Sequence, residues 1–287
     1  MAVFSRSYQS YAGTKTSQRW RFLILSRYAL EDWLRSRAFL GWLAVSMVPV
    51  LVGASFIYLS HNTAARTLIG LVKLGDWARI DARFFVEAVT TQCFFGFILA
   101  AWVGPTLVGR DLANGALPLY LSRPLSRFEY ILGKLTVLVG LTSAVTWGAG
   151  LLLYALNCFL AGDGWWLAHW RIAVGLVVGG LAWSMAVSLF ALALSSWIRW
   201  RLLASSMLIG LYFVSAGLAE VLATTLHTPW GRLLNLAQDF RMIWSQLFDA
   251  QPPASVPTSA AWAVVTLLTA ASMLVLNRKL RAREVVG

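Results

Sequence analysis

The sequence contains 287 residues, of which 59% are hydrophobic and only 13% are charged. A soluble domain carries about 25% charged residues, so this chain has too little polar surface to cover a water-soluble core. Its formal net charge is +12 at pH 7, but the basic residues gather at the ends of apolar runs, where anionic membrane lipids attract them. The composition therefore indicates an integral membrane protein and argues against a nucleic-acid-binding protein.

The amino-terminal segment precedes the first long apolar run. Residues 1–18 are polar and rich in Ser and Thr, and we expect them to form a mobile cytoplasmic tail. Residues 19–37 are amphipathic: Arg27, Glu31 and Arg35 are spaced four apart, which places opposite charges on one face of a helix. We interpret this segment as an elbow helix on the membrane surface. The alternative is that it is only the start of the first span.

Six apolar stretches follow, and five of them are longer than 20 residues. A helix needs about 20 apolar residues to cross a hydrocarbon core of about 30 Å. The stretches are apolar on every face rather than alternating, which favours helices over barrel strands. The sequence therefore predicts an all-α, polytopic membrane protein with six transmembrane helices in a domain over 38–277, followed by a cytoplasmic tail over 278–287; the spans are 38–59, 88–108, 135–157, 172–197, 202–223 and 260–276.

The distribution of basic residues predicts the orientation of these spans. Of the 24 Lys and Arg residues, 17 fall on the same side of the membrane as the amino terminus and seven on the other side. Cytoplasmic loops carry the excess of Lys and Arg. We therefore expect both termini to be cytoplasmic, in a multi-pass protein of the inner (plasma) membrane.

Two further features concern packing. The longest outer segment contains Trp230–Leu247, which we expect to form an interfacial helix that ends before Pro252. The fourth span contains Gly175 and Gly179, and small residues four apart allow another helix to approach closely. That helix belongs either to the same chain or to a second copy.

Two polar residues inside predicted spans are candidates for a translocation path. Glu220 is the only acidic residue inside a span, and a rise of 1.5 Å per residue places it near the outer end of its helix. It either anchors that helix at the interface or lines a path. Gln92, in the second span, is the other candidate path residue.

The connection between the second and third spans differs from an ordinary polar loop. Asn114-Gly115 predicts a turn, apolar residues follow, and Ser126 with Glu129 three residues later predicts the start of a new helix. An apolar ridge that is flanked by charges outside the membrane is suited to docking in a groove of a partner protein.

This connection resembles that of type-2 ATP-binding-cassette exporter permeases. The matching positions are Asp111, Gly115-Ala116-Leu117, Leu121-Ser122-Arg123-Pro124, Ser126-Arg127 and Gly133-Lys134. Ala116 departs from the Thr that is usual in that family. The resemblance implies a coupling segment that receives motion from a separate ATPase, with coupling residues Arg110, Asp111, Ala113, Gly115, Leu117, Pro118, Leu121, Arg123, Pro124 and Arg127.

The resemblance also implies partners and cofactors. The chain would pair with itself or with a homologous permease, would bind two copies of an ATPase subunit, and would be surrounded by membrane lipid. ATP and Mg²⁺ would bind to the partner ATPase, and we expect no cofactor on this chain. Gly133-Lys134 is not a phosphate-binding loop, because Phe128 and Leu135 occupy the positions that require Gly and Ser or Thr.

Two other functions stay open. The first is a membrane-embedded enzyme that acts on lipid-linked substrates, whose candidate residues are His61, Asp76, Asp81, Arg83 and Glu87. The second is a scaffold that recruits a cytoplasmic protein through the same connection without moving a cargo. We find no catalytic triad order, and the three His residues are too far apart in the sequence to indicate a metal site.

Overall fold

The computed structural model describes residues 21–62, 80–115, 126–162, 164–198, 200–252 and 256–279. Within these ranges the chain forms helices and no strands. The elements are α1 (Arg21–Leu34), α2 (Arg37–His61), α4 (Ala82–Ala113), α6 (Arg127–Ser143), the π-helical turn η3 (Ala144–Gly148), α7 (Ala149–Ala161), α8 (Trp165–Ala168), α9 (Trp170–Trp197), α10 (Arg201–Thr225), the 3-10 helix η4 (Pro229–Leu234), α11 (Leu236–Leu247) and α12 (Thr258–Lys279).

The prediction of an all-α protein with six membrane-spanning helices is confirmed. The described residues contain six helices that are long and apolar enough to span a membrane: α2, α4, the continuous helix made by α6, η3 and α7, α9, α10 and α12. Each helix is longer than the apolar stretch that predicted it. The amphipathic segment before the first span is also helical, as α1, and Arg27 Nε lies 2.8 Å from Glu31 Oε1 on its exposed face.

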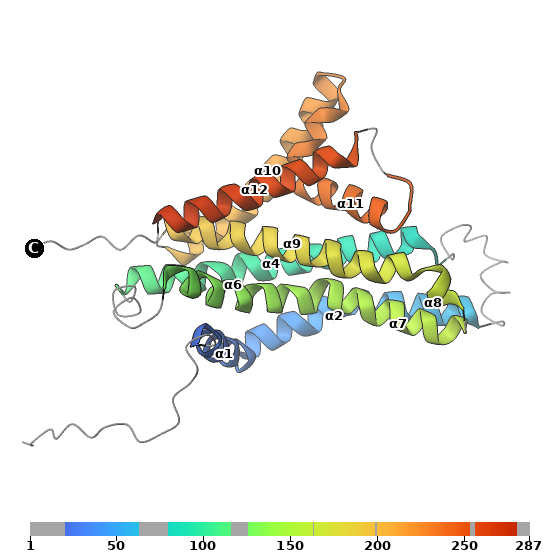
Figure 1. The fold of residues 1–287 in the computed structure, drawn as a ribbon, viewed down its shortest axis with the longest axis horizontal. Coiled ribbons are helices and arrows are strands. Elements are labelled where there is room, and N and C mark those ends of the chain that lie inside the picture. The colour runs from blue at the N-terminus through green and yellow to red at the C-terminus, as the bar shows by residue number, and fades with distance from the viewer. Residues whose placement is uncertain are drawn as a thin grey trace, which may run out of the picture.

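Apart from α10, the spans lie roughly along the long axis of the molecule (Figure 1). We call the two ends of this bundle the α1 end and the α8 end, after the short helices that lie there. Helix α9 is the most buried span and lies against α4, α6 and α12, whereas only 17–22% of the most apolar part of α2, α10 and α12 is buried. Helix α10 leans away from the bundle in Figure 1.

The centre of the bundle depends on two glycines. The turn η3 brings Thr146 and Trp147 against α4 and α9. A Cβ atom on Gly96 would lie 2.6 Å from Thr146 Cγ2, and one on Gly180 would lie 2.3 Å from Trp147 Cγ. These distances are far below van der Waals contact, so α4, η3 and α9 can approach this closely only because both positions lack a side chain.

The segment after α10 differs from our prediction. We expected one interfacial helix over Trp230–Leu247, but the chain forms η4 and then α11, with a break at Asn235. The Asn235 Oδ1 atom accepts hydrogen bonds from the backbone N–H groups of Ala237 and Gln238, at 3.1 and 3.4 Å, and so starts the second helix. Helix α11 is also not confined to the surface, because Phe240, Trp244 and four neighbouring residues are buried against the spans.

Gly175 and Gly179 provide the space in which α11 packs. A Cβ atom on Gly175 would lie 2.7 Å from Phe248 Cε1, and one on Gly179 would lie 3.0 Å from Leu247 Cδ1. The close approach that these small residues predicted is therefore made within the chain, between α9 and the end of α11.

Candidate functional site

A buried polar cluster lies at the α1 end, where α4 meets α6. Asp111 Oδ2 accepts a hydrogen bond from the Tyr130 hydroxyl at 2.7 Å and lies 2.9 Å from Lys134 Nζ. The Lys134 side chain is 8% exposed and the Asp111 side chain 15% exposed. The Lys134 ammonium also lies 5.6 Å from the centre of the Tyr130 ring. We call these three residues the Asp111 cluster.

The local sequence explains why these side chains meet. Helix α6 begins with a complete capping box, in which Ser126 Oγ accepts from the Glu129 N–H at 3.2 Å and Glu129 Oε2 accepts from the Ser126 N–H at 2.6 Å. This start fixes the phase of α6. Tyr130 and Lys134 are then one turn apart on the same face, which is turned toward the last turn of α4 and Asp111.

Helix α1 packs against the same part of α6. Ser26 Oγ donates a hydrogen bond to the Gly133 carbonyl oxygen at 2.8 Å, and Ser26 is itself buried. A Cβ atom on Gly133 would lie 3.1 Å from the Phe22 carbonyl oxygen, so Gly133 allows the two backbones to approach closely. Helix α1, the end of α4 and the start of α6 therefore form one packed unit (Figure 1).

The electrostatics of the cluster favour keeping its partners in contact. A charge that is removed from water is stable only while its partner and its hydrogen bonds stay in place, and breaking a buried pair leaves the remaining charge uncompensated. Asp111 and Lys134 lie on either side of the connection between α4 and α6. The cluster therefore fixes the two ends of that connection relative to each other.

The structure describes part of the predicted coupling segment. Arg110 and Ala113 lie in the backbone of α4, and Gly115 follows it in a turn with φ of +62°, a conformation that favours glycine. Arg127 is the exposed first residue of α6. The remaining predicted coupling residues lie outside the described residues: Leu117, Pro118, Leu121, Arg123 and Pro124.

Two residues at this end were not among the candidate site residues. Tyr130 of the Asp111 cluster makes a part-buried hydrogen bond to Asp111, and Ser26 of α1 makes a buried one to the Gly133 carbonyl oxygen. The four-residue spacing of Tyr130 and Lys134 is a signal that was present in the sequence. The contact between Ser26 and Gly133 joins residues 107 positions apart and leaves no such signal.

The two candidate path residues lie apart from each other. Gln92 is buried, and its Nε2 atom donates to the Ser46 carbonyl oxygen of α2 at 3.1 Å. Glu220 lies on the exposed side of α10, and its Oε1 atom is 3.7 Å from a guanidinium nitrogen of Arg232 in η4. The described residues therefore place Gln92 in a contact between two spans and Glu220 in an exposed ion pair.

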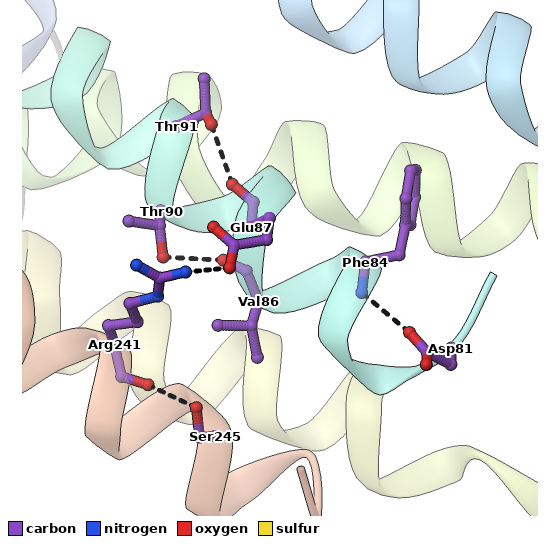
Figure 2. Close-up of polar contacts among 8 residues, drawn as sticks. All are labelled: Asp81, Phe84, Val86, Glu87, Thr90, Thr91, Arg241 and Ser245. Carbon is purple, nitrogen blue, oxygen red and sulfur yellow. Dashed lines mark hydrogen bonds and ion pairs between the residues drawn. The ribbon is translucent and has the colours of Figure 1, made fainter. Parts of the chain in front are cut away.

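The candidate residues of the enzyme hypothesis have structural contacts of their own. Asp81 Oδ1 accepts from the Phe84 N–H at 3.1 Å at the start of α4, and Glu87 forms an ion pair with Arg241 of α11 (Figure 2). His61 Nδ1 lies 2.9 Å from the Ile57 carbonyl oxygen of its own helix. Arg83 is exposed and Asp76 lies outside the described residues. Among the residues described, no group of three His, Cys, Asp or Glu side chains could hold a metal ion.

The fold defines the chain as a multi-pass, all-helical membrane protein. No protein-family model matches the sequence, and no match is found among curated proteins. The function is therefore argued from the Asp111 cluster and from the connection that it flanks.

Proposed function

We propose that this chain is the permease subunit of an ATP-driven exporter and that it binds a separate cytoplasmic ATPase through its α1 end. The observation that supports this proposal is the Asp111 cluster. The resemblance of the adjacent connection to the coupling segment of type-2 exporter permeases supports it as well. The nucleotide and Mg²⁺ would be bound by the partner ATPase.

The mechanism follows from how the α1 end is built. A coupling segment must transmit a movement from a partner to the spans without deforming. The buried pair of Asp111 and Lys134 joins α4 to α6, and the hydrogen bond from Ser26 to Gly133 joins α6 to α1. A displacement of the connection would therefore move three helices together as a rigid body, which is a common way to change the exposure of a path.

The translocation path itself would be completed by a second permease. Helices α2 and α10 expose large apolar residues along their length, including Val48, Leu51, Phe213 and Val214. Lipid or a second copy of the chain can cover such faces. A path between two copies would place the exposed Glu220 of α10 near its outer end.

The experiment is photocrosslinking of the full chain in its native membrane. Both native cysteines, Cys93 and Cys158, are first replaced by Ala, and a single Cys is introduced at Asn114, next to the exposed turn. A benzophenone maleimide on this Cys is expected to crosslink to a nucleotide-binding ATPase. The matched control carries the Cys at Leu167, which is exposed on α8 at the opposite end.

The outcomes separate the functions under consideration. Crosslinking of an ATPase from position 114 but not from position 167, and native mass spectrometry of two permeases with two ATPases, are the expected results. ATP-dependent transport in sealed vesicles then distinguishes a permease from a scaffold. If position 114 captures no ATPase and the purified chain turns over lipid-linked substrates by itself, the exporter proposal is wrong and the enzyme hypothesis replaces it.

A variant of the cluster tests coupling more directly. Tyr130→Phe removes one hydrogen bond to Asp111 and keeps the ring. We expect the complex to assemble as before and the cargo moved per ATP hydrolysed to fall. A Tyr154→Phe variant, which alters a hydroxyl at the α8 end, is the control and should keep the normal ratio.

A further inference from the structure

A largely enclosed cavity lies between α4, α9, α10 and α11, in the half of the bundle toward the α8 end. Its volume is about 140 Å³, and none of its lining residues is charged. More than half of the lining residues are aromatic: Phe94 and Phe97 of α4, Trp183 of α9, Tyr212 of α10, and Phe240 and Trp244 of α11.

The volume of the cavity limits the size of a ligand. An enclosed apolar cavity of about 150 Å³ holds one benzene molecule. At about 140 Å³, this cavity therefore has room for about one aromatic ring. Because the cavity is partly open, a small substituent need not fit within that volume. Aromatic walls favour an aromatic ligand, because rings attract one another in edge-to-face and offset-stacked arrangements. The wall itself contains such pairs: Phe97 and Tyr212 stack at 4.2 Å, and Phe240 and Trp244 meet edge to face at 5.6 Å.

One hydrogen-bond donor in the wall has no partner. Trp244 is 1% exposed, and its Nε1 atom has no acceptor among the described residues. The benzo edge of the indole rests on α9, since Cζ3 and Cε3 lie 3.2 and 3.3 Å from the Cβ position of Gly179. The N–H is on the opposite edge of the ring and points away from Gly179. A buried N–H without an acceptor is costly, and a ligand that accepts its hydrogen bond removes that cost.

The charges around the cavity argue against a cationic ligand. Aromatic rings also attract cations, but a cation in an apolar site needs a counter-charge. No carboxylate lines this cavity. The charged residues closest in sequence to its wall are Asp239 and Arg241, on either side of Phe240. Arg241 is neutralised by Glu87 in the ion pair that joins α4 to α11 (Figure 2). Asp239 is buried, and burial raises its pKa to about 8, so at neutral pH it holds its proton and supplies no counter-charge.

We propose that this cavity is a binding site for an uncharged, single-ring aromatic compound with one hydrogen-bond acceptor, which takes the Trp244 N–H. Entry follows from the packing of α10. Tyr212 reaches into the wall from α10, while the neighbouring Leu211 and Phe213 are exposed. A small outward movement of α10 separates Tyr212 from Phe97 and opens the cavity. The proposal does not depend on the exporter function.

The test compares two ligands of the same shape on the purified full chain. Benzonitrile carries an acceptor and toluene does not, and saturation-transfer NMR measures the binding of each in detergent. We expect benzonitrile to bind about fivefold more tightly than toluene, the factor that one net hydrogen bond supplies. Trp244→Phe keeps an aromatic ring and removes the donor, so it should bring the ratio of the two affinities close to one.

A second variant fills the cavity. Ala237 lines it, and Ala237→Leu should abolish binding of both compounds. The matched control is Ala44→Leu, which adds the same atoms to an exposed position on α2 and should bind as the wild type does. If Ala237→Leu does not fold, the ratio of the two affinities in Trp244→Phe still tests whether the ligand accepts a hydrogen bond from Trp244.

Several results would overturn the proposal. These are wild-type binding in Ala237→Leu, an unchanged ratio in Trp244→Phe, or saturable binding of tetramethylammonium in place of the two ring compounds. No ATPase takes part in this measurement. If the two ring compounds do not bind, the exporter proposal is therefore unaffected. If no ATPase is captured by crosslinking, the proposal of this binding site is unaffected.

Discussion

Gly180 offers the sharpest test of how the bundle packs. In Gly180→Ala the new Cβ would lie 2.3 Å from Trp147 Cγ and 2.4 Å from Trp147 Cβ. A rotamer change could move Trp147 Cγ but not Trp147 Cβ, whose position is fixed by the backbone. Ordinary contact begins at 3.4 Å, and α9 and η3 must therefore separate by about 1 Å, with loss of the dispersion contacts around them.

The expected magnitude follows from two opposing effects. Overpacking a tight core costs about 1–3 kcal/mol. Replacing Gly by Ala inside a helix contributes about 0.5–1 kcal/mol of stability where there is space. Gly210 of α10 has no atom within 4 Å of its Cβ position, so Gly210→Ala shows the second effect alone. We expect the two variants to differ by about 2–3 kcal/mol, or about 5–10 °C in thermal midpoint.

The assay is thermal unfolding of the purified chain in detergent. The fraction of protein that still elutes at the folded position in size-exclusion chromatography is measured after heating to each temperature. Combining Gly180→Ala with Trp147→Gly should remove most of the penalty that the clash adds, measured as the coupling in a double-mutant cycle, because Trp147 Cβ and Cγ are then both absent. If Gly180→Ala is as stable as Gly210→Ala, or if the penalty persists without the Trp147 ring, the packing at η3 has been misinterpreted.

Two further predictions concern buried charges, and each is measured as a midpoint of unfolding. Lys134→Met should destabilise the chain by about 3–5 kcal/mol, since it leaves Asp111 buried without its charged partner. The control is Arg171→Met, which breaks an exposed pair with Asp249 and should cost less than about 1 kcal/mol. Equal losses of stability in the two variants would contradict the burial of the cluster. Burial raises the pKa of Asp239 to about 8, so the folded chain keeps this proton up to that pH while the unfolded chain releases it near about pH 4. Stability from this group is therefore full below about pH 4 and falls as the pH rises toward 8. Asp239→Asn should raise the midpoint more at pH 8 than at pH 5 relative to the wild type, and an equal change at both pH values would contradict this reasoning.

The six spans could be predicted from the sequence because a bilayer imposes a simple rule. Each crossing requires a long run of apolar residues whose backbone hydrogen bonds are satisfied within the helix. The capping box at Ser126 and Glu129 was equally visible, because both of its hydrogen bonds join residues three positions apart. Rules of this kind depend only on neighbours in the sequence.

Helix α11 shows where such rules end. Its sequence has one apolar face, and that pattern fits a helix on the membrane surface as well as a helix packed into the bundle. What decides between them is the groove at Gly175 and Gly179, which accepts Phe248, Leu247 and Trp244 from a segment about 70 residues away. The sequence shows that these glycines permit close packing and does not show what packs there.

Helix α4 connects the two sites that we propose. It carries Asp111 at the α1 end and Phe94, Phe97 and Glu87 toward the α8 end. The helix continues through Pro105 without a break, and Ser195 Oγ of α9 donates a hydrogen bond to the Pro105 carbonyl oxygen at 3.3 Å. If α4 moves as one unit, its two ends move together. A displacement that a partner imposes at the Asp111 cluster would therefore shift the wall of the aromatic cavity, and by the reciprocity of linked equilibria a ligand in that cavity would bias the position of the cluster.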